Sequence, residues 1–230
     1  MKSWQNDDEL FEIAKTELFP ALVGDILDRM GRLNQFLHPE IKPIAGHMVL
    51  IGRAYTVLEA DLSEAVAIPS SNPALNKPFG LMFEALDNMK PNDVYTCTGA
   101  TSAYALWGGL MSTRALQLKA AGALVNGYSR DTNELLNLNF PTFSKGTYAQ
   151  DQGSRGRVIA YGIPITINGV TINMGDIIFG DRDGVVVVPQ NIADEAFSKA
   201  IEKSRGEKLV KKALEKGMST VDAFDKFGIM

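Results

Sequence analysis

The sequence predicts an α/β fold in which a parallel strand–helix–strand half is followed by an antiparallel half. Residues 93–126 contain two β-rich runs separated by a glycine-rich loop and a helical segment, the pattern of parallel strands joined by a crossover. Beyond residue 156 the apolar runs become short and flank tight-turn sequences. The two halves are expected to close into a compact β/α sandwich or distorted barrel.

The length of the chain fits one domain. Its 230 residues, of which 45% are hydrophobic and 22% charged, can bury a substantial core. No internal repeat, low-complexity tract or linker divides them. We therefore expect a single domain over residues 1–230, with N-terminal helices at 6–31, a core at 45–190 and a C-terminal helix at 191–217.

The elements before the crossover follow from spacing and from helix start and stop signals. They are a helix at 10–18, a second helix between Pro20 and Gly31, a strand at 48–59, a long loop at 61–80 and a helix at 81–89. The first two helices are expected to act as a lid or a subunit contact. Gly52 inside the strand indicates a bulge or a close backbone approach.

The crossover unit consists of a strand at 93–97, a glycine-rich loop at 99–109, a helix at 110–121 and a strand at 123–126. A short helix at 132–138 and a strand at 141–145 follow. Asn168-Gly169 then predicts one hairpin, and the segment Gly-Asp-Arg-Asp-Gly between residues 179 and 185 predicts another. A long charged helix is expected at 193–215, with a break near Gly206. Such a helix needs a surface to pack against, and another subunit could provide it.

The composition excludes several classes of function. A formal net charge of -4 and a pI near 5.3 provide no basic surface for nucleic acid. No apolar run approaches the roughly 20 residues that span a bilayer, and the acidic N-terminus is unlike a leader peptide. Cys97, the single cysteine, lies in an apolar strand, which favours a buried thiol in a reducing compartment. We expect a soluble cytoplasmic protein that binds neither nucleic acid nor membrane.

An anion site is predicted where Gly108 and Gly109 lead into a helix that opens with Leu110 and Met111. Backbone N–H groups at a helix start lack intrahelical partners, and the helix dipole adds partial positive charge, so a carboxylate or phosphate could bind there. The hydroxyl group of Ser112 or Thr113 could also contact the anion. The alternative is that the glycines make a tight turn and Ser112 caps the helix.

Arg130 and Asp131 follow the second strand of the crossover, at the sheet edge where ligands of open α/β sheets bind. A guanidinium can hold a carboxylate or an enolate, while the adjacent carboxylate offers oxygen ligation to Mg²⁺ or Mn²⁺. Together they would hold an anionic substrate on a metal ion. The alternative is a surface turn in which the two charges pair with each other or with the next helix.

Other polar residues have ordinary explanations. Asp181 and Asp183 are typical of a hairpin turn, and Lys145 is either solvated or within reach of an anion. His38 and His47 lack metal-ligand spacing. The sequence contains no phosphate-binding P-loop, zinc pattern, serine elbow or dinucleotide fingerprint.

With these residues in place, the chain resembles the RraA-like family over roughly residues 20–217. This family joins regulators of ribonuclease E activity to class II pyruvate aldolases that act on 4-hydroxy-4-methyl-2-oxoglutarate. The matching segments are GRAYTV at 52–57, ALWGGLMSTRA at 105–115, GALVNGYSRD at 122–131, FPTFSKGT at 140–147, INGVTINMGDIIFGDRDGVVVVP at 167–189 and the helix end at 207–217.

The resemblance implies a swivelling β/β/α fold assembled as a trimer or hexamer, with active sites between subunits. It implies that Arg130 contacts substrate and stabilises an enolate, and that Asp131 binds Mg²⁺ or Mn²⁺. The amides of Gly109 to Met111 would hold a substrate carboxylate, and Glu207 of an adjacent subunit would act through metal-bound water. The chain departs from the pattern at Gly109, where the aldolases usually carry an acidic residue.

A second departure is the loop at 61–80, so the family's asparagine is not carried over to Asn72 or Asn76. Our leading hypothesis is a metal-dependent lyase that cleaves a carbon–carbon bond of a 2-oxo acid, by aldol cleavage or by decarboxylation of an oxaloacetate-like compound. The alternative, favoured by Gly109, is a non-catalytic regulator that binds a partner protein. Methyl transfer to a quinone lacks support because the sequence contains no nucleotide fingerprint.

Overall fold

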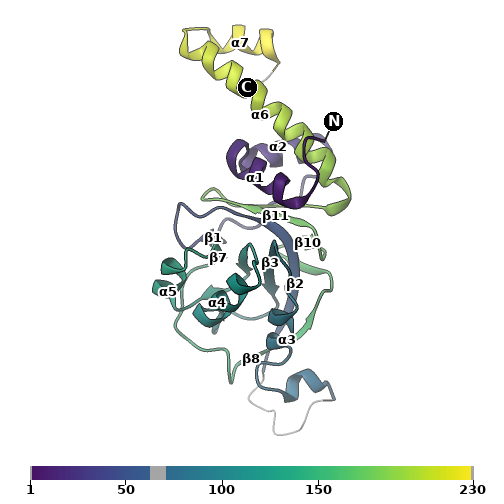
Figure 1. Cartoon of the computed structure of the whole chain (residues 1–230), viewed down its shortest axis with the longest axis vertical. Coiled ribbons are helices and arrows are strands. Elements are labelled where there is room, and N and C mark those ends of the chain that lie inside the picture. Colours follow the sequence, from purple (N-terminus) through teal and green to yellow (C-terminus); the bar gives the residue numbers. More distant parts are fainter. Residues whose placement is uncertain (1, 63–70, 229–230) are drawn as a thin grey trace.

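A computed structural model describes residues 2–62 and 71–228 of the chain. Its centre is a mixed sheet with the strand order β1-β7-β5-β3-β2-β11-β12, and β8 pairs with the second half of β2 (Figure 1). The strands are β1 (Lys42–Pro43), β2 (Leu50–Asp61), β3 (Asp93–Thr98), β5 (Gly122–Val125), β7 (Thr142–Ser144), β8 (Gly156–Tyr161), β11 (Ile177–Gly180) and β12 (Val185–Val188). The α/β fold class is therefore confirmed.

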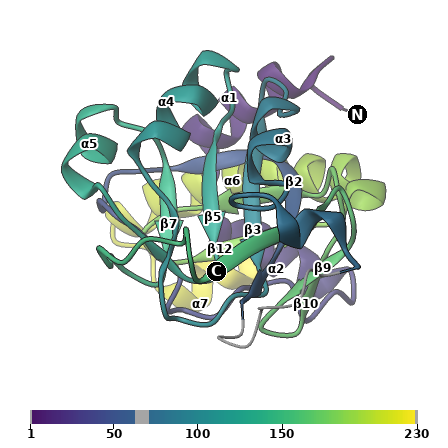
Figure 2. The same cartoon turned by 90° about the horizontal axis from the view of Figure 1, so that it is seen from below.

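The parallel half of the sheet is formed by β2, β3, β5 and β7, which pair as parallel neighbours. Three short helices accompany it, α3 (Met82–Asp87), α4 (Gly109–Gln117) and α5 (Thr132–Asn137). Figure 2 shows them along one side of the sheet, where Tyr95 and Cys97 of β3 face a shared core. The predicted parallel crossover is confirmed, and the carboxyl ends of β3, β5 and β7 open toward the same edge.

The antiparallel half contains the two predicted hairpins. The first is β9 (Ile165–Ile167) with β10 (Val170–Ile172), and its turn residues Asn168 and Gly169 have φ of 50° and 84°. Positive φ at both central residues is what a two-residue hairpin turn requires. The second hairpin joins β11 to β12, and Asp181 accepts a hydrogen bond from the amide of Asp183 within its turn. The turn interpretation of these aspartates is confirmed.

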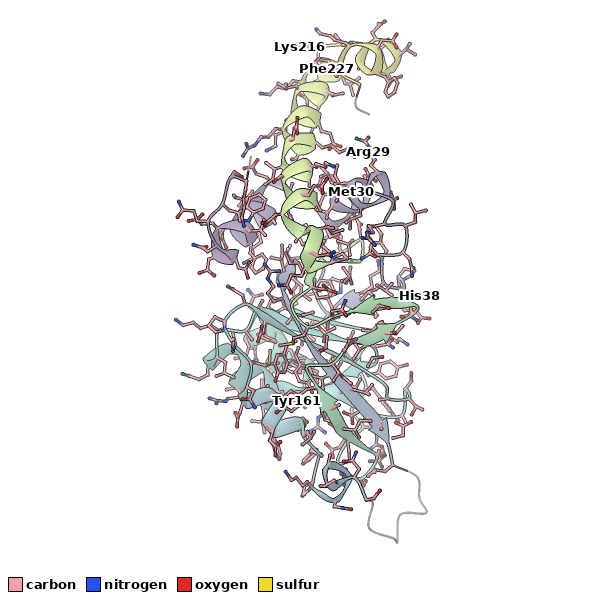
Figure 3. All side chains as sticks on the ribbon, turned by 90° about the vertical axis from the view of Figure 1, so that its right-hand side faces the viewer. Arg29, Met30, His38, Tyr161, Lys216 and Phe227 are labelled. Carbon is pink, nitrogen blue, oxygen red and sulfur yellow. The ribbon has the colours of Figure 1, made fainter. Side chains whose placement is uncertain are left out.

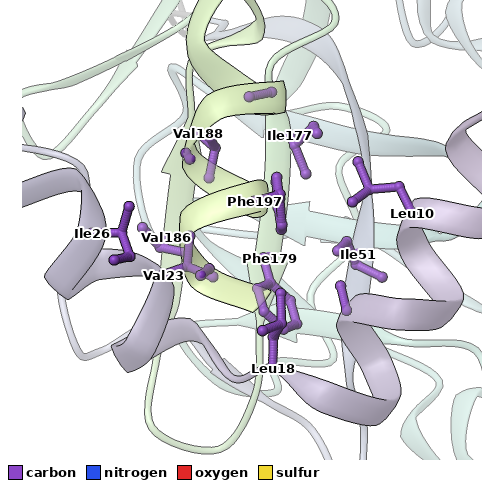
Figure 4. Close-up of a cluster of buried hydrophobic side chains, with 14 of the residues drawn as sticks. Leu10, Leu18, Val23, Ile26, Ile51, Ile177, Phe179, Val186, Val188 and Phe197 are labelled. Carbon is purple, nitrogen blue, oxygen red and sulfur yellow. The ribbon is translucent and has the colours of Figure 1, made fainter. Parts of the chain in front are cut away.

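The N-terminal helices complete the core of the domain. Helices α1 (Asp7–Glu17) and α2 (Pro20–Arg29) pack with α6 (Ala193–Glu215) against the face of β11 and β12. Figure 4 shows Leu10 and Val23 converging with Phe197 on this face. All three side chains are nearly or fully buried. The apolar faces of the first two helices bury this core, so the expected lid is not observed, while their contact with another subunit stays a prediction.

Helix α6 is longer than the surface that supports it. It runs through Gly206 without the predicted break, because a single interior glycine costs only about 1 kcal/mol relative to alanine. Its last turns and α7 (Thr220–Phe227), a helix that we did not predict, project beyond α1 and α2 (Figures 1 and 3). Figure 3 places Lys216 and Phe227 at the tip, far from Tyr161 on the sheet. Contact of this arm with another subunit stays a prediction.

Several short elements differ from expectation. Sequence reasoning missed β1, β8 and the small parallel pair β4 (Ala105–Trp107) and β6 (Tyr128–Ser129). Helix α4 ends at Gln117, not at residue 121, because Lys119 has φ of 61° and turns the chain. Of the predicted loop at 61–80, residues 63–70 lie outside the described residues, and the rest contains the 3-10 helix Pro73–Asn76. A second 3-10 helix spans Gln190–Ile192. No helix in the described ranges is long and apolar enough to cross a bilayer.

Candidate active site

The small β4–β6 pair brings the glycine loop and the charged pair together. β4 leads directly into Gly108, the residue that precedes α4, and β6 leads directly into Arg130. The two strands are parallel, and the amide of Arg130 donates to the carbonyl oxygen of Trp107 at 2.9 Å. Main-chain hydrogen bonds therefore fix the start of α4 beside Arg130 and Asp131.

The Asp131 carboxylate faces α4 and does not cap its own helix. Asp131 precedes α5 with φ of 58° and ψ of 39°, a left-handed conformation, and makes no side-chain capping bond there. Its Oδ2 accepts a hydrogen bond from the amide of Gly109 at 3.0 Å. Arg130 Nε lies 3.7 Å from the same oxygen, and Arg130 Nη1 lies 2.8 Å from Asp151 Oδ1. Arg130 and Asp131 therefore do pair with each other, within a charged cluster that also includes Asp151.

Close approach explains both glycines. A Cβ at Gly108 would lie 2.7 Å from Asp131 Oδ2 and 3.3 Å from Arg130 Cγ, both shorter than ordinary contacts. A Cβ at Gly109 would overlap the carboxylate of Glu134, which projects from α5. The glycines thus allow two carboxylates to reach the N-terminus of α4, where the helix dipole favours negative charge.

The predicted anion site has fewer available backbone amides than expected. The Gly109 amide already bonds Asp131, and the first intrahelical bond runs from Ser112 N to Gly108 O at 3.0 Å. The amides of Leu110 and Met111 therefore lie in the turn that has no intrahelical acceptor. The hydroxyl of Ser112 faces inward, where it accepts from Trp107 Nε1 at 2.7 Å and donates to Gly108 O. Neither the suggested hydroxyl contribution of Ser112 to an anion nor its role as helix cap is observed.

A pocket of about 340 Å³ opens beside this charged cluster. Its lining includes five of the predicted site residues, namely Gly108, Leu110, Met111, Arg130 and Asp131. Glu207 is elsewhere, on α6, where its carboxylate lies 3.4 Å from Lys203 Nζ. Since α6 is at the opposite end of the molecule from α4 (Figure 1), Glu207 could reach such a pocket only from another subunit.

Sequence reasoning missed Asp151, Gln152 and Glu134. Asp151 and Gln152 line the pocket from the loop that follows β7, and Asp151 is the carboxylate that pairs with Arg130. Because β7 is parallel to β5, its carboxyl end opens on the same edge as Arg130, so extending the argument from strand ends to a third strand would have indicated this loop. Glu134 gave no such signal, because its position depends on the left-handed turn at Asp131.

Behind the pocket lies a buried carboxyl group. Glu59 on β2 is only 3% exposed, and its Oε1 accepts from Gln152 Nε2 at 2.6 Å. Tyr104 Oη is 3.4 Å from Glu59 and donates to Asp61 Oδ1 at 2.9 Å. Burial raises the pKa of Glu59 to about 8, and the nearby Asp61 charge acts in the same direction. The loop that carries Asp151 is thus anchored to a carboxyl group that tends to keep its proton.

The remaining candidates do not join the site. Cys97 is fully buried, and burial raises the pKa of its thiol well above the usual range, so the predicted buried thiol is confirmed. Lys145 lies 4.0 Å from Glu40 and does not line the pocket. His38 lies near Glu40, and His47 contacts Asn139.

The donor set suits a hard divalent cation held by few protein ligands. Asp131 Oδ2 is engaged by the Gly109 amide, while its Oδ1 has no hydrogen-bond partner among the described residues. No group of three or more His, Cys, Asp or Glu side chains able to hold a metal occurs in residues 2–62 and 71–228. Mg²⁺ commonly binds through one or two carboxylates and keeps water or substrate oxygens as its other ligands. Asp131 fits that mode.

The sequence also matches known proteins. A family model named RraA-like, described as Aldolase/RraA, matches residues 21–187. Protein DlpA of Legionella pneumophila is 31% identical over 208 residues, which cover 90% of this chain but 32% of DlpA, so the chain spans about a third of that relative. A protein of Halalkalibacterium halodurans with the provisional name 4-hydroxy-4-methyl-2-oxoglutarate aldolase is 29% identical, with 88% of this chain and 87% of that protein covered.

A solved structure has the same architecture. Streptomyces coelicolor RraAS2, described as an unusual member of the RNase ES inhibitor RraA protein family, superimposes with a TM-score of 0.75 at 22% identity. The match covers 90% of this chain and 98% of that one. At this identity the likeness establishes the fold.

Proposed function

Because the chain belongs to the RraA-like family, we propose that it is a divalent-metal-dependent carbon–carbon lyase acting on a 2-oxo acid. The reaction is aldol cleavage that releases pyruvate, or decarboxylation of an oxaloacetate-like acid. The observation that supports this most is the convergence on one pocket of Arg130, Asp131 and the first turn of α4, where the amides of Leu110 and Met111 have no intrahelical acceptor. Such a set matches a small acid with a carboxylate and an adjacent carbonyl oxygen.

The bond changes of aldol cleavage define what the pocket must do. A proton leaves the C4 hydroxyl group, the C3–C4 bond breaks, and its electron pair forms the enolate of pyruvate, which is then protonated at C3. The Leu110 and Met111 amides would hold the C1 carboxylate at the N-terminus of α4. The Arg130 guanidinium would donate hydrogen bonds to the oxygen on which negative charge develops, and preorganised donors of this kind supply large stabilisation of a transition state.

Asp131 is the proposed metal ligand. A divalent cation bound there would supply Lewis-acid polarisation of the 2-oxo group. The hydrogen bond from the Gly109 amide orients the Asp131 carboxylate, and Asp151 orients Arg130 from the opposite side. The protein's own contribution is therefore to hold both charged side chains in fixed positions before substrate arrives.

Proton transfer has two candidate groups. Glu134 lies over Gly109 and places a carboxylate where the related aldolases carry an acidic side chain on the loop itself. Glu207 would contribute only across a subunit interface, in the trimer or hexamer that the family resemblance implies. We favour Glu134 as the group within the chain, because its position follows from contacts with the loop.

The test is pyruvate release from a panel of 4-hydroxy-2-oxo acids and oxaloacetate, with and without Mg²⁺ or Mn²⁺. Asp131→Ala is expected to abolish the metal-dependent part and to lower kcat by about 100-fold or more, as loss of one preorganised charged partner typically does. Asp183→Ala, which removes a carboxylate from the β11–β12 turn outside the pocket, is the matched control. Metal-dependent turnover that survives Asp131→Ala would refute the assignment.

A non-catalytic regulator is the second candidate. Two observations favour it: the loop itself carries no acid at Gly109, and the projecting arm exposes Leu209, Val221 and Phe224, which are 57%, 68% and 55% exposed. Exposed apolar side chains of this kind are common at protein interaction sites. Absence of turnover across the whole panel, in folded protein that binds Mg²⁺, would favour this function over the lyase.

A further inference from the structure

The pocket beside α4 is lined by two chemically different sets of side chains. Its charged side chains are those of Arg130, Asp131 and Asp151. Its apolar wall consists of side chains from α3, the residues before it and the first turn of α4, namely Phe79, Met82, Phe83, Leu86, Leu110 and Met111. Phe79 and Phe83 contact each other edge to face, with ring centroids 5.4 Å apart. A ligand that fills this pocket therefore has a charged head and an apolar tail.

The apolar wall has no cation to receive a second negative charge. Arg130 is the one cationic side chain among the described residues that line the pocket, and it already pairs with Asp151. On the neighbouring surface, Lys77 is paired with Glu84 at 2.7 Å, and Arg114 on α4 is paired with Asp87 at 2.8 Å. A carboxylate on the ligand's tail would lose water without gaining a counter-charge, which is unfavourable.

The exposure of the wall residues favours contact with a ligand. Met82 and Leu86 are 7% and 6% exposed, so the base of the wall is set by the core. Phe83 and Leu110 are 54% and 83% exposed and stand where the pocket meets solvent. An apolar tail lying between them would remove apolar surface from water on both partners, which is favourable.

We propose that the ligand of this pocket is a monocarboxylic 2-oxo acid whose C4 carries an aliphatic or aromatic group. The identity of the ligand's head group rests on the proposed lyase function, and the identity of its tail rests on the apolar wall. An example is 4-hydroxy-2-oxo-4-phenylbutanoate, whose ring would lie against Phe79 and Phe83. Cleavage of its C3–C4 bond, with loss of the hydroxyl proton and gain of a proton at C3, gives pyruvate and benzaldehyde. This class differs from 4-hydroxy-4-methyl-2-oxoglutarate, a dicarboxylate.

Binding of two ligands that share a head group tests the tail directly. The ligands are 2-oxo-4-phenylbutanoate and 2-oxoglutarate, which lack the C4 hydroxyl group and so cannot undergo aldol cleavage. Titration calorimetry of the full chain with Mg²⁺ is expected to show about 10-fold or tighter binding of the phenyl compound, the gain typical of burying an apolar side group. Equal affinity, tighter binding of 2-oxoglutarate, or binding of neither ligand would overturn the proposal.

Two variants connect the preference to the wall. Phe83→Ala is expected to remove most of the preference for the phenyl compound, whereas Phe83→Lys should shift it toward 2-oxoglutarate by supplying a cation. Phe224→Ala is the matched control, because Phe224 is 55% exposed and lies on α7, outside the pocket. An unchanged preference in both Phe83 variants would show that the ligand does not contact the wall.

Turnover separates this proposal from the lyase assignment. Pyruvate release is compared for 4-hydroxy-2-oxo-4-phenylbutanoate and 4-hydroxy-4-methyl-2-oxoglutarate, and the first is expected to have the higher kcat/KM. Faster cleavage of the dicarboxylate would refute the tail assignment and leave the lyase standing. Cleavage of neither, together with tighter binding of the phenyl ligand, would refute the lyase and leave the tail assignment standing.

Discussion

Replacing Glu59 with glutamine should remove a loss of stability that the native protein suffers as pH rises. Burial raises the pKa of Glu59 from 4.5 to about 8; the Asp61 charge adds to this, while hydrogen bonds from Tyr104 and Gln152 and the charge of Arg157 oppose it. The folded chain therefore keeps a proton that the unfolded chain has lost. The stabilisation is complete below the unfolded value of 4.5 and declines until the pH passes about 8.

The magnitude follows from the size of that interval. A difference of one bound proton changes the free energy of unfolding by about 1.4 kcal/mol for each pH unit. Between the unfolded and folded pKa values of Glu59 the native protein should lose about 3–5 kcal/mol through this group alone. Glutamine keeps the size and an oxygen acceptor for the Gln152 amide but does not titrate, so the variant escapes this loss.

Denaturant unfolding of both proteins at a series of pH values between about 5 and 8 measures the effect. The difference in unfolding free energy should move in favour of Glu59→Gln by about 1.4 kcal/mol for each unit of rising pH. Glu12→Gln, which removes a solvent-exposed carboxyl group on α1, controls for the substitution itself. A difference that stays constant across the range would refute the buried, protonated carboxyl group.

Two further predictions concern close contacts. Glu134→Ala should lower kcat for pyruvate release by about 100-fold or more, the usual contribution of a general acid or base. Gly109→Asp in that background should restore part of the loss, because the alanine leaves the space over Gly109 that the Glu134 carboxylate fills. Steady-state kinetics measure both effects, and an unchanged kcat in the single variant excludes Glu134 from proton transfer. Gly52→Ala should lower stability by about 1–3 kcal/mol, because its Cβ would overlap the carbonyl oxygen of Asn92 and lie 2.8 Å from Ala121 Cβ. Thermal unfolding measures this loss, and an unchanged Tm would show that the sheet yields at this point.

Local signals in the sequence predicted the parts of the fold that depend on neighbouring residues. Asn168-Gly169 specifies its hairpin because both residues accept positive φ, and the segment at 93–126 specifies a parallel crossover by its order and length. Gly52 was expected at a close approach, which the Asn92 carbonyl confirms. These features needed no knowledge of distant contacts.

The missed features depend on pairing between distant segments. β4 is three residues long, and only its pairing with β6 makes it a strand. Glu59 belongs to a strand that sequence reasoning did predict, but its burial depends on Gln152 and Tyr104, which belong to other segments. In the candidate site, Arg130 and Asp131 were found because they follow a strand. Asp151 was missed because its strand was considered without its parallel neighbour.

The charged and the apolar residues of the pocket should differ in their tolerance to substitution, because the β4–β6 pair fixes only the charged ones. Arg130 and the start of α4 are joined through main-chain hydrogen bonds, which side-chain substitutions leave in place. The wall that includes Phe79 and Phe83 comes from a separate short helix and the residues before it. Mutations in α3 could therefore retune which acid is accepted while the charged residues keep their geometry, a division that would let related proteins diverge in substrate without rebuilding the reaction centre.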